Sequence, residues 1–253
     1  MERIYAVANQ KGGVGKTTTA VNLGGYLARM GHNVLLVDMD PQGNASSGLG
    51  VDIRELPRSV YSMLIGELSA SEILQPTHIK GLSILPSNTD LAGIEPDLLQ
   101  TDNREYVLKR ALEQLKTRYE IVLIDCPPNL GILTLNALCA ASRVLIPLQT
   151  EYYALEGLTQ LLDAISRVQK NFNPTLILDG VVLTMYDSRT SMSQQVVEDV
   201  RSHFHDRVYQ AVIPRNVKLS EAPSFGQFIG DYAPDSTGAA AYQALAKEVY
   251  DRG

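Results

Sequence analysis

The stretch KGGVGKTT at residues 11–18 decides the fold of this chain. It follows an apolar run at residues 4–8 and opens a helical pattern at residues 17–29. A strand that turns on glycines into the start of a helix directs several backbone N–H groups, and the positive end of the helix dipole, at one point. Lys16 adds a positive charge there, and Thr17 adds a hydroxyl suited to Mg²⁺. The sequence therefore predicts a phosphate-binding loop.

This loop departs from the ordinary Walker A pattern G-x-x-x-x-G-K-[ST], because Gln10 occupies the place of the first glycine. A second lysine, Lys11, stands beside it. A decayed motif could explain the difference, but two further phosphate-handling segments follow at suitable places in the chain. We interpret the stretch as a variant nucleotide loop. The residues expected to bind nucleotide here are Lys11, Gly12, Gly13, Val14, Gly15, Lys16, Thr17 and Thr18.

The second segment, DMDPQGN at residues 38–44, directly follows an apolar run at residues 34–37. Carboxylates at the carboxyl end of a strand reach the crevice in which α/β proteins hold their ligands. Asp38 and Asp40 are two residues apart, so on an extended chain both point toward a metal-bound phosphate or its attacking water. A simple turn would explain the proline and the glycine, but it would not explain two acids on one side.

The third segment, IVLIDCPPNLG, covers residues 121–131. Its four apolar residues end at Asp125, which is the pattern of a Walker B strand whose acid holds Mg²⁺ through water. The two prolines that follow are stiff and Gly131 is permissive, which suits a loop that responds to a γ-phosphate. The three segments together indicate a magnesium-dependent nucleotide site.

Apolar runs alternate with amphipathic stretches along the whole chain. The runs are nearly continuous, as in strands buried on both faces of a parallel sheet, and helical patterns lie between them. They predict an α/β fold of the P-loop NTPase type, in which helices flank one doubly wound, mostly parallel sheet and residues 1–253 form a single domain. Residues 43–57 read as a loop rich in glycine and serine. The expected strands are 4–8, 34–37, 82–85, 121–124, 144–148 and 176–183, and the expected helices are 17–29, 104–116 and 155–170.

Composition limits the classes of protein that fit. No apolar run approaches the roughly 20 residues of a membrane span, and the chain enters its first strand too early to leave room for a signal peptide. We therefore expect a cytoplasmic protein. Cys126 and Cys139 fall in apolar surroundings typical of small buried residues. The net charge of −6 argues against a surface coated in positive charge, although a local basic patch can still bind nucleic acid.

Five stretches together resemble the ParA/Soj chromosome- and plasmid-partitioning ATPases of the deviant Walker A class. They are KGGVGKTTT, DMDPQGN, IVLIDCPPNLG, EYYALEGL and PRNVKLSEAPSFG, and the likeness runs from residue 4 to about residue 249. The resemblance implies an ATP-dependent homodimer that segregates DNA, binds double-stranded DNA nonspecifically, and associates with the nucleoid. It also implies slow hydrolysis of ATP to ADP and phosphate, stimulated by a ParB/Spo0J-type centromere-binding protein.

The resemblance further assigns roles to residues. Lys11 would cross the dimer interface to the nucleotide of the partner subunit, and Asp40 would position the hydrolytic water. The adenine would rest against Pro214 and Asn216 in a late loop that could otherwise be a surface turn. The catalytic residues are then Lys11, Lys16 and Asp40. The metal contacts are then Thr17, Asp38 and Asp125.

Basic residues late in the chain match the DNA contacts of the family. The matching positions are Arg189 and Lys218, with Arg215 a weaker candidate. Relatives often carry arginine at the second position. Lysine keeps the charge but loses the forked donor geometry, so attraction to phosphate should survive. For any one of these residues a solvated surface charge is an equal interpretation. Nothing ahead of the first strand suggests an N-terminal helix-turn-helix domain.

Two other functions share parts of this pattern. A MinD-like cell-division ATPase would use a basic amphipathic membrane helix at its end, and here the tail contains only Lys247 and Arg252 as basic residues. We therefore expect no membrane partner. A nucleotide-dependent metabolic enzyme, such as an amide-forming synthetase or a nitrogenase-type reductase, is the second alternative. The reductase would need cluster-bridging cysteines, for which the two cysteines lack a suitable context.

Overall fold

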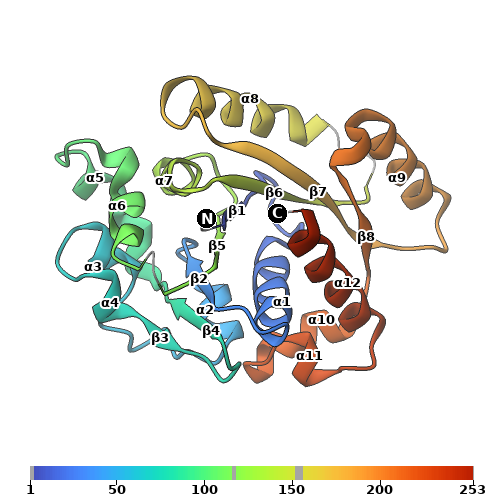
Figure 1. Ribbon diagram of the computed structural model, residues 1–253, viewed down its shortest axis with the longest axis horizontal. Coiled ribbons are helices and arrows are strands. Elements are labelled where there is room, and N and C mark those ends of the chain that lie inside the picture. Colours follow the sequence, from blue (N-terminus) through green and yellow to red (C-terminus); the bar gives the residue numbers. More distant parts are fainter. Residues whose placement is uncertain (1–2, 116–117, 152–155, 253) are drawn as a thin grey trace.

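The computed structural model describes residues 3–115, 118–151 and 156–252. An eight-stranded sheet runs through the molecule in the order β3-β4-β2-β5-β1-β6-β7-β8, and helices cover both of its faces (Figure 1). Neighbouring strands pair in parallel except for β3 and β4, which are antiparallel. This is the predicted α/β fold. The strands are β1 (Arg3–Val7), β2 (Val34–Asp38), β3 (Gln75–Pro76), β4 (Leu82–Leu85), β5 (Ile121–Asp125), β6 (Arg143–Gln149), β7 (Ile177–Tyr186) and β8 (Val208–Pro214).

Two apolar clusters fill the spaces between the sheet and its helices. Side chains along a strand alternate between the faces, so Ala6 belongs to one cluster while Tyr5 and Val7 belong to the other. The first cluster packs beneath α6, α7 and α8, and the second beneath α1 and α12. The α-helices are α1 (Lys16–Arg29), α2 (Asn44–Gly48), α3 (Val60–Leu64), α4 (Ala70–Ile73), α5 (Ile94–Leu98), α6 (Val107–Glu113), α7 (Ile132–Ala140), α8 (Glu156–Asn171), α9 (Ser191–Phe204), α10 (Val217–Glu221), α11 (Ile229–Tyr232) and α12 (Thr237–Arg252).

The sheet brings the three predicted phosphate-handling segments to one edge. They follow β1, β2 and β5, which are parallel neighbours whose carboxyl ends lie together. Asp38 and Asp125 are direct register partners on β2 and β5. Polar residues far apart in the sequence therefore meet at a switch point of the topology, where α/β folds hold ligands.

The structure contains helices and strands that the sequence did not predict, and it changes the bounds of others. Part of the expected loop at 43–57 is helical, because α2 begins directly after Gly43. The expected helix 104–116 begins as the 3₁₀ helix η2 (Arg104–Tyr106) and continues as α6. Its predicted end, Lys116, and the predicted start of α8, Leu155, lie outside the described residues. β8 was not predicted, because the exposed Gln210 interrupts its apolar residues and the strand therefore forms no continuous apolar run. In the described ranges, no helix is long and apolar enough to cross a membrane.

Candidate nucleotide site

The loop between β1 and α1 is shaped for an anion. Gly13 and Gly15 have φ of 75° and 89°, values that favour glycine. Lys16 is the first residue of α1, and its side chain is buried. Its Nζ donates a hydrogen bond to the carbonyl oxygen of Lys11, 3.1 Å away across the loop. Burial lowers the pKa of Lys16, and the nearby Asp125 opposes that shift. A phosphate in this loop would give the Lys16 ammonium an anionic hydrogen-bond partner in place of the neutral carbonyl.

Asp125 is the only carboxylate that is buried without a hydrogen-bond partner among the described residues, and this holds for both of its oxygens. Burial raises its pKa well above the ordinary value, and Asp38 adds to that shift. The Thr17 hydroxyl is near enough to lower the pKa without reaching hydrogen-bond geometry. A buried, unpartnered carboxylate beside a hydroxyl is a donor set that suits a hard divalent cation such as Mg²⁺.

Asp38 is also buried, but its oxygens are in use. Oδ1 accepts the backbone N–H of Asp40 at 3.1 Å, and Oδ2 accepts the backbone N–H and the hydroxyl of Ser46 at 2.8 and 2.7 Å. Burial raises the pKa of Asp38 to about 6 against the lowering effect of these bonds. Asp38 thus ties the end of β2 to α2. Its contact with a metal stays a prediction.

Asp40 lies at the same edge of the sheet. It is buried, and its Oδ1 accepts the backbone N–H of Gln42 at 3.0 Å. Its charge raises the pKa of Lys16, which places the two groups within electrostatic reach. Among the described residues no group of three or more His, Cys, Asp or Glu could hold a metal ion. A cation here would therefore take further ligands from Thr17, phosphate oxygens and water.

Lys11 points away from this acidic cluster. Its Nζ forms an ion pair with Glu151 at 2.9 Å, and both side chains are about half exposed. Glu151 also accepts a hydrogen bond from Gln149. The position at the surface leaves Lys11 available to reach another molecule. Its contact with a partner subunit's nucleotide stays a prediction.

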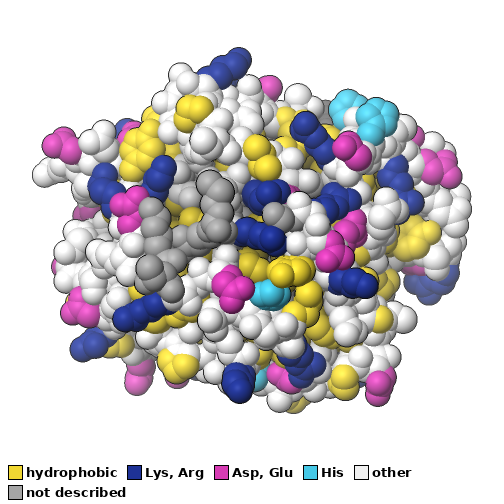
Figure 2. Space-filling view, in the orientation of Figure 1, with side chains coloured by type: hydrophobic (Ala, Val, Ile, Leu, Met, Phe, Trp, Pro, Cys, Tyr) yellow, Lys and Arg dark blue, Asp and Glu magenta, His cyan; other side chains and the backbone are white. Residues whose placement is uncertain are grey.

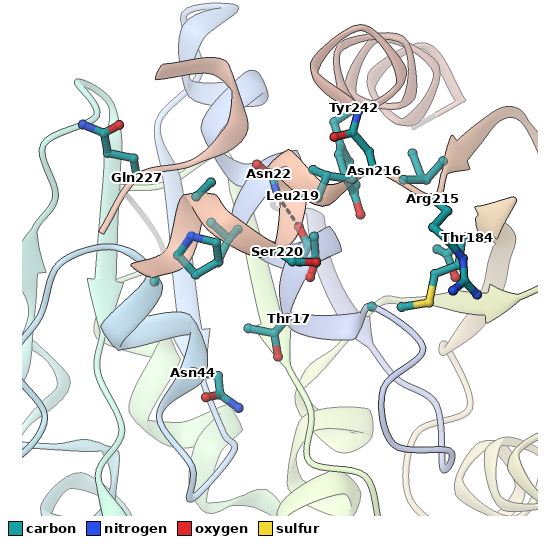
Figure 3. Close-up of a pocket in the computed structure, with 18 of the residues that line it drawn as sticks. Thr17, Asn22, Asn44, Thr184, Arg215, Asn216, Leu219, Ser220, Gln227 and Tyr242 are labelled. Carbon is teal, nitrogen blue, oxygen red and sulfur yellow. Dashed lines mark hydrogen bonds between the residues drawn. The ribbon is translucent and has the colours of Figure 1, made fainter. Parts of the chain in front are cut away.

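A cavity of about 480 Å³ continues from the loop. Thr17 from α1 and Asn44 from α2 lie on one side of it, and Ser220 from α10 lies on the facing segment (Figure 3). Pro214 and Asn216, predicted to meet the base, both line it. The cavity can hold the base and sugar of a nucleotide whose phosphates occupy the adjoining loop.

The Asn216 side chain makes hydrogen bonds that stabilise one wall of this cavity. Its Oδ1 accepts the backbone N–H of Lys218 at 2.8 Å, which caps the N-terminus of α10, and its Nδ2 donates to the Thr237 hydroxyl at 2.8 Å. The asparagine therefore joins α10 to the start of α12. The contact of Pro214 and Asn216 with adenine stays a prediction.

Comparisons with known proteins agree with this geometry. A family model described as an AAA domain matches residues 2–178. Sporulation initiation inhibitor protein Soj of Bacillus subtilis is 53% identical over 253 residues, with both chains fully covered. Chromosome partitioning protein ParA of Caulobacter vibrioides is 53% identical over 99% of this chain and 94% of its own. The chain belongs to the ParA/Soj family of chromosome-partitioning ATPases.

Two solved structures are also similar to this ParA/Soj chain, and one of them contains a bound nucleotide and magnesium. Cobyrinic acid a,c-diamide synthase from Mycobacterium smegmatis, solved with ADP and magnesium, has a TM-score of 0.86 and 45% identity, covering 98% of this chain and 93% of its own. The cell division ATPase MinD from Pyrococcus furiosus has a TM-score of 0.82 and 28% identity, with both chains fully covered.

The ParA/Soj residues predicted to contact DNA lie on segments that border the cavity. Arg189 follows the carboxyl end of β7, and Lys218 lies on α10. The Arg215 backbone N–H donates to the Tyr186 carbonyl at 2.9 Å, which brings the two segments together. Arg215 itself lines the cavity, on the Thr184 side in Figure 3. Arg215 therefore lies both at the cavity and next to the segment that carries Arg189. The contact of Arg189, Lys218 and Arg215 with DNA stays a prediction.

Thr184 and Met185 are among the site residues that the sequence did not predict. The Thr184 hydroxyl donates to the Val14 carbonyl at 2.8 Å and so fixes the phosphate loop to β7. Met185, which lines the cavity, has a φ of 53° although it is not glycine. Backbone strain of this kind is common at ligand sites. The only signal in the sequence was their place at the carboxyl end of a predicted strand, which singles out no residue type.

Proposed function

We propose that this chain binds ATP with Mg²⁺ in the site described above and uses slow hydrolysis as a switch for DNA partitioning. The observation that carries the proposal is the unpartnered, buried carboxylate of Asp125, which lies within electrostatic reach of the Lys16 ammonium at a phosphate loop. Such a pair of opposite, poorly satisfied charges is complementary to a phosphate with its cation. The relatives' family and the magnesium and adenine nucleotide in the similar synthase structure support the same cofactors.

Each of the site residues has a separate role in the proposed hydrolysis of ATP. Lys16 and the loop N–H groups would hold and neutralise the phosphates, and Thr17 and Asp125 would hold the cation, whose chemistry when bound would be to stabilise charge on the phosphate oxygens. Asp40 orients the attacking water and accepts its proton. Products are ADP and phosphate. Turnover is slow in one subunit alone, because its phosphates lack the second lysine that a partner subunit would supply. In the single chain Lys11 is paired with Glu151 of its own chain.

The switch acts on DNA and on a protein partner. We infer that the ATP state is a homodimer which presents two basic patches to nonspecific double-stranded DNA, and that this holds the protein on the nucleoid. A ParB-type centromere-binding protein would complete the catalytic geometry and stimulate turnover. The names of the Soj and ParA relatives, which are 53% identical to this chain over 99% of its length or more, support these partners.

A metabolic role was one of the two alternatives, and the similar synthase gives an example of such an enzyme. An amide-forming enzyme that drew ammonia from glutamine would need a reactive thiolate. Cys126 and Cys139 are both buried, and burial raises the pKa of each thiol, to about 12 for Cys139. The described part of the chain thus offers no accessible cysteine for such chemistry.

The experiment that tests the proposal measures ATP hydrolysis and DNA binding together. Purified protein with Mg²⁺ and ATP should retard double-stranded DNA of unrelated sequences about equally, and ADP should not support this. ATP turnover should rise with DNA and the ParB-type protein. Sedimentation with liposomes serves as a control for a MinD-like activity. ATP-dependent membrane binding without DNA binding would contradict the proposal.

A further inference from the structure

Two of the three cations predicted to contact DNA, Arg189 and Lys218, are paired with acids of their own chain. Arg189 donates from Nε and Nη2 to the two oxygens of Asp187, at 2.9 and 2.7 Å. Lys218 Nζ lies 2.8 Å from Glu221 Oε2. The Arg189 side chain is nevertheless 83% exposed and that of Lys218 51%. Each cation can therefore meet an external phosphate, but only beside a fixed negative charge.

Both acids are held in the charged form. The Arg189 bonds hold the pKa of Asp187 well below its usual range, and the bonds from Lys218 and Tyr232 lower the pKa of Glu221. Asp187 Oδ1 also accepts the Arg189 backbone N–H at 3.0 Å, and Glu221 accepts the Tyr232 hydroxyl at 2.9 Å. These added bonds fix each carboxylate in place next to its cation.

Exposed ion pairs of this kind are weak, so they do not prevent a phosphate from binding. They do lower the net charge that a phosphate meets, and the acid repels the approaching anion. On the face shown in Figure 2, Lys and Arg side chains are interspersed with Asp and Glu side chains. An acid beside a cation weakens the attraction of that cation to DNA phosphate.

We propose that Asp187 and Glu221 restrain DNA binding by competing with DNA phosphate for Arg189 and Lys218. The restraint keeps the affinity of a single subunit low, so that stable binding requires the two patches of a dimer acting together. Removing either acid should strengthen binding and make it less dependent on ATP. This inference rests on the proposed function, because it presupposes that the dimer binds DNA.

The test uses Asp187→Asn and Glu221→Gln, measured by fluorescence anisotropy with a random-sequence DNA duplex in ATP and in ADP. Both replacements keep the shape and an acceptor oxygen for the bond from Arg189 N–H or Tyr232. Each should tighten binding about five-fold in ATP, since each acts twice in a dimer. Glu95→Gln on α5, at the opposite end of the molecule, is the matched charge control and should bind like wild type (Figure 1).

A double-mutant cycle distinguishes release of the Arg189 guanidinium from a general loss of negative charge. In an Arg189→Ala background, Asp187→Asn should bring a much smaller gain than it does beside Arg189, because only the direct repulsion between acid and phosphate is then removed; the comparison is made at low salt, where weaker binding is still detectable. Affinities equal to the Glu95→Gln control, or a gain that is undiminished without Arg189, would overturn the inference while leaving the proposed function intact. Wild-type protein that binds no DNA in ATP would overturn the proposed function, and this inference with it.

Discussion

Asp125 and its neighbour Asp38 make the stability of the nucleotide-free protein depend on pH. Burial raises the pKa of both, to about 6 for Asp38. A carboxyl group with a higher pKa in the folded chain binds more protons there than in the unfolded chain. The free energy of unfolding therefore falls as pH rises through the interval between the two values. For Asp38 that interval runs from 3.8 to about 6, and for Asp125 it extends well above 3.8.

Asp125→Asn should remove the larger part of this effect. We expect the nucleotide-free variant to melt about 2–4 °C above wild type at pH 8, because it no longer buries a charge. The gain should shrink at pH 5, where the wild-type carboxyl is protonated to a greater extent. Thermal denaturation with Mg²⁺ and ATP should reverse the order, because the variant loses a metal contact. A variant that Mg²⁺ and ATP stabilise as much as wild type would contradict the metal assignment.

Lys16→Ala should abolish tight ATP binding. The buried Lys16 ammonium donates its hydrogen bond to a neutral loop carbonyl, so burying its positive charge costs free energy. A bound phosphate would offset that cost by pairing with the charge. Isothermal titration calorimetry with ATP and Mg²⁺ measures the loss. Lys109→Ala, an exposed change on α6, is the control and should bind like wild type. Unchanged affinity in Lys16→Ala would remove this residue from the site.

Asp40→Ala should leave ATP binding and dimerisation intact and reduce turnover by about 10²-fold or more, the usual scale for a lost water-positioning group. Phosphate release under saturating ATP gives the rate, and calorimetry gives the affinity. Asp40→Asn preserves an acceptor for the Gln42 N–H, so it separates chemistry from loop structure. Full activity in the asparagine variant would assign Asp40 to shaping the loop.

Among the helices and strands, the sequence predicts those that leave a regular pattern of apolar residues and misses those that depend on a single tertiary contact. The strands at 34–37 and 121–124 and the helix after the glycine loop were predicted, because buried parallel strands and a glycine turn leave strong local patterns. Helix α2 and strand β8 were not. Helix α2 is five residues long and is held by Ser46 bonding to Asp38 across the turn, a tertiary contact that no local periodicity reveals.

The N-terminus of α10 offers a test at this scale. Asn216→Ala removes both the cap on Lys218 N–H and the bond to Thr237, and should cost about 1 kcal/mol of stability. It should also weaken ATP binding, because α10 forms a wall of the cavity. Asn216→Ser retains a capping oxygen and should recover most of the stability. Denaturant unfolding measures the first effect and calorimetry the second. Equal stability of the alanine variant and wild type would show that the cap is unimportant.

For the whole molecule, the proposed function requires that two subunits approach through the loops at one edge of the sheet. In the single chain, Lys11 is paired with Glu151, at the same edge as the cation site. Dimerisation must exchange this exposed pair for contacts across the interface, an exchange with a small free-energy cost. The glycine beside Lys11 then decides how closely the backbones can meet, since any side chain there projects into the space between subunits.

Gly12→Val tests that approach. A Cβ added at Gly12 would find its nearest neighbour, Pro128 Cβ, 4.0 Å away, so the single subunit has room for the start of a side chain. The variant should therefore fold and bind ATP with Mg²⁺ like wild type, while the branched side chain blocks the second subunit. Gel filtration with ATP should show a monomer, and ATP-dependent DNA binding should be lost with the dimer. Gly93→Val, where an added Cβ also meets nothing within 4 Å, is the matched control and should still dimerise. A normal dimer of Gly12→Val would mean that the subunits do not meet across this loop, because no rearrangement within one chain relieves a clash between two.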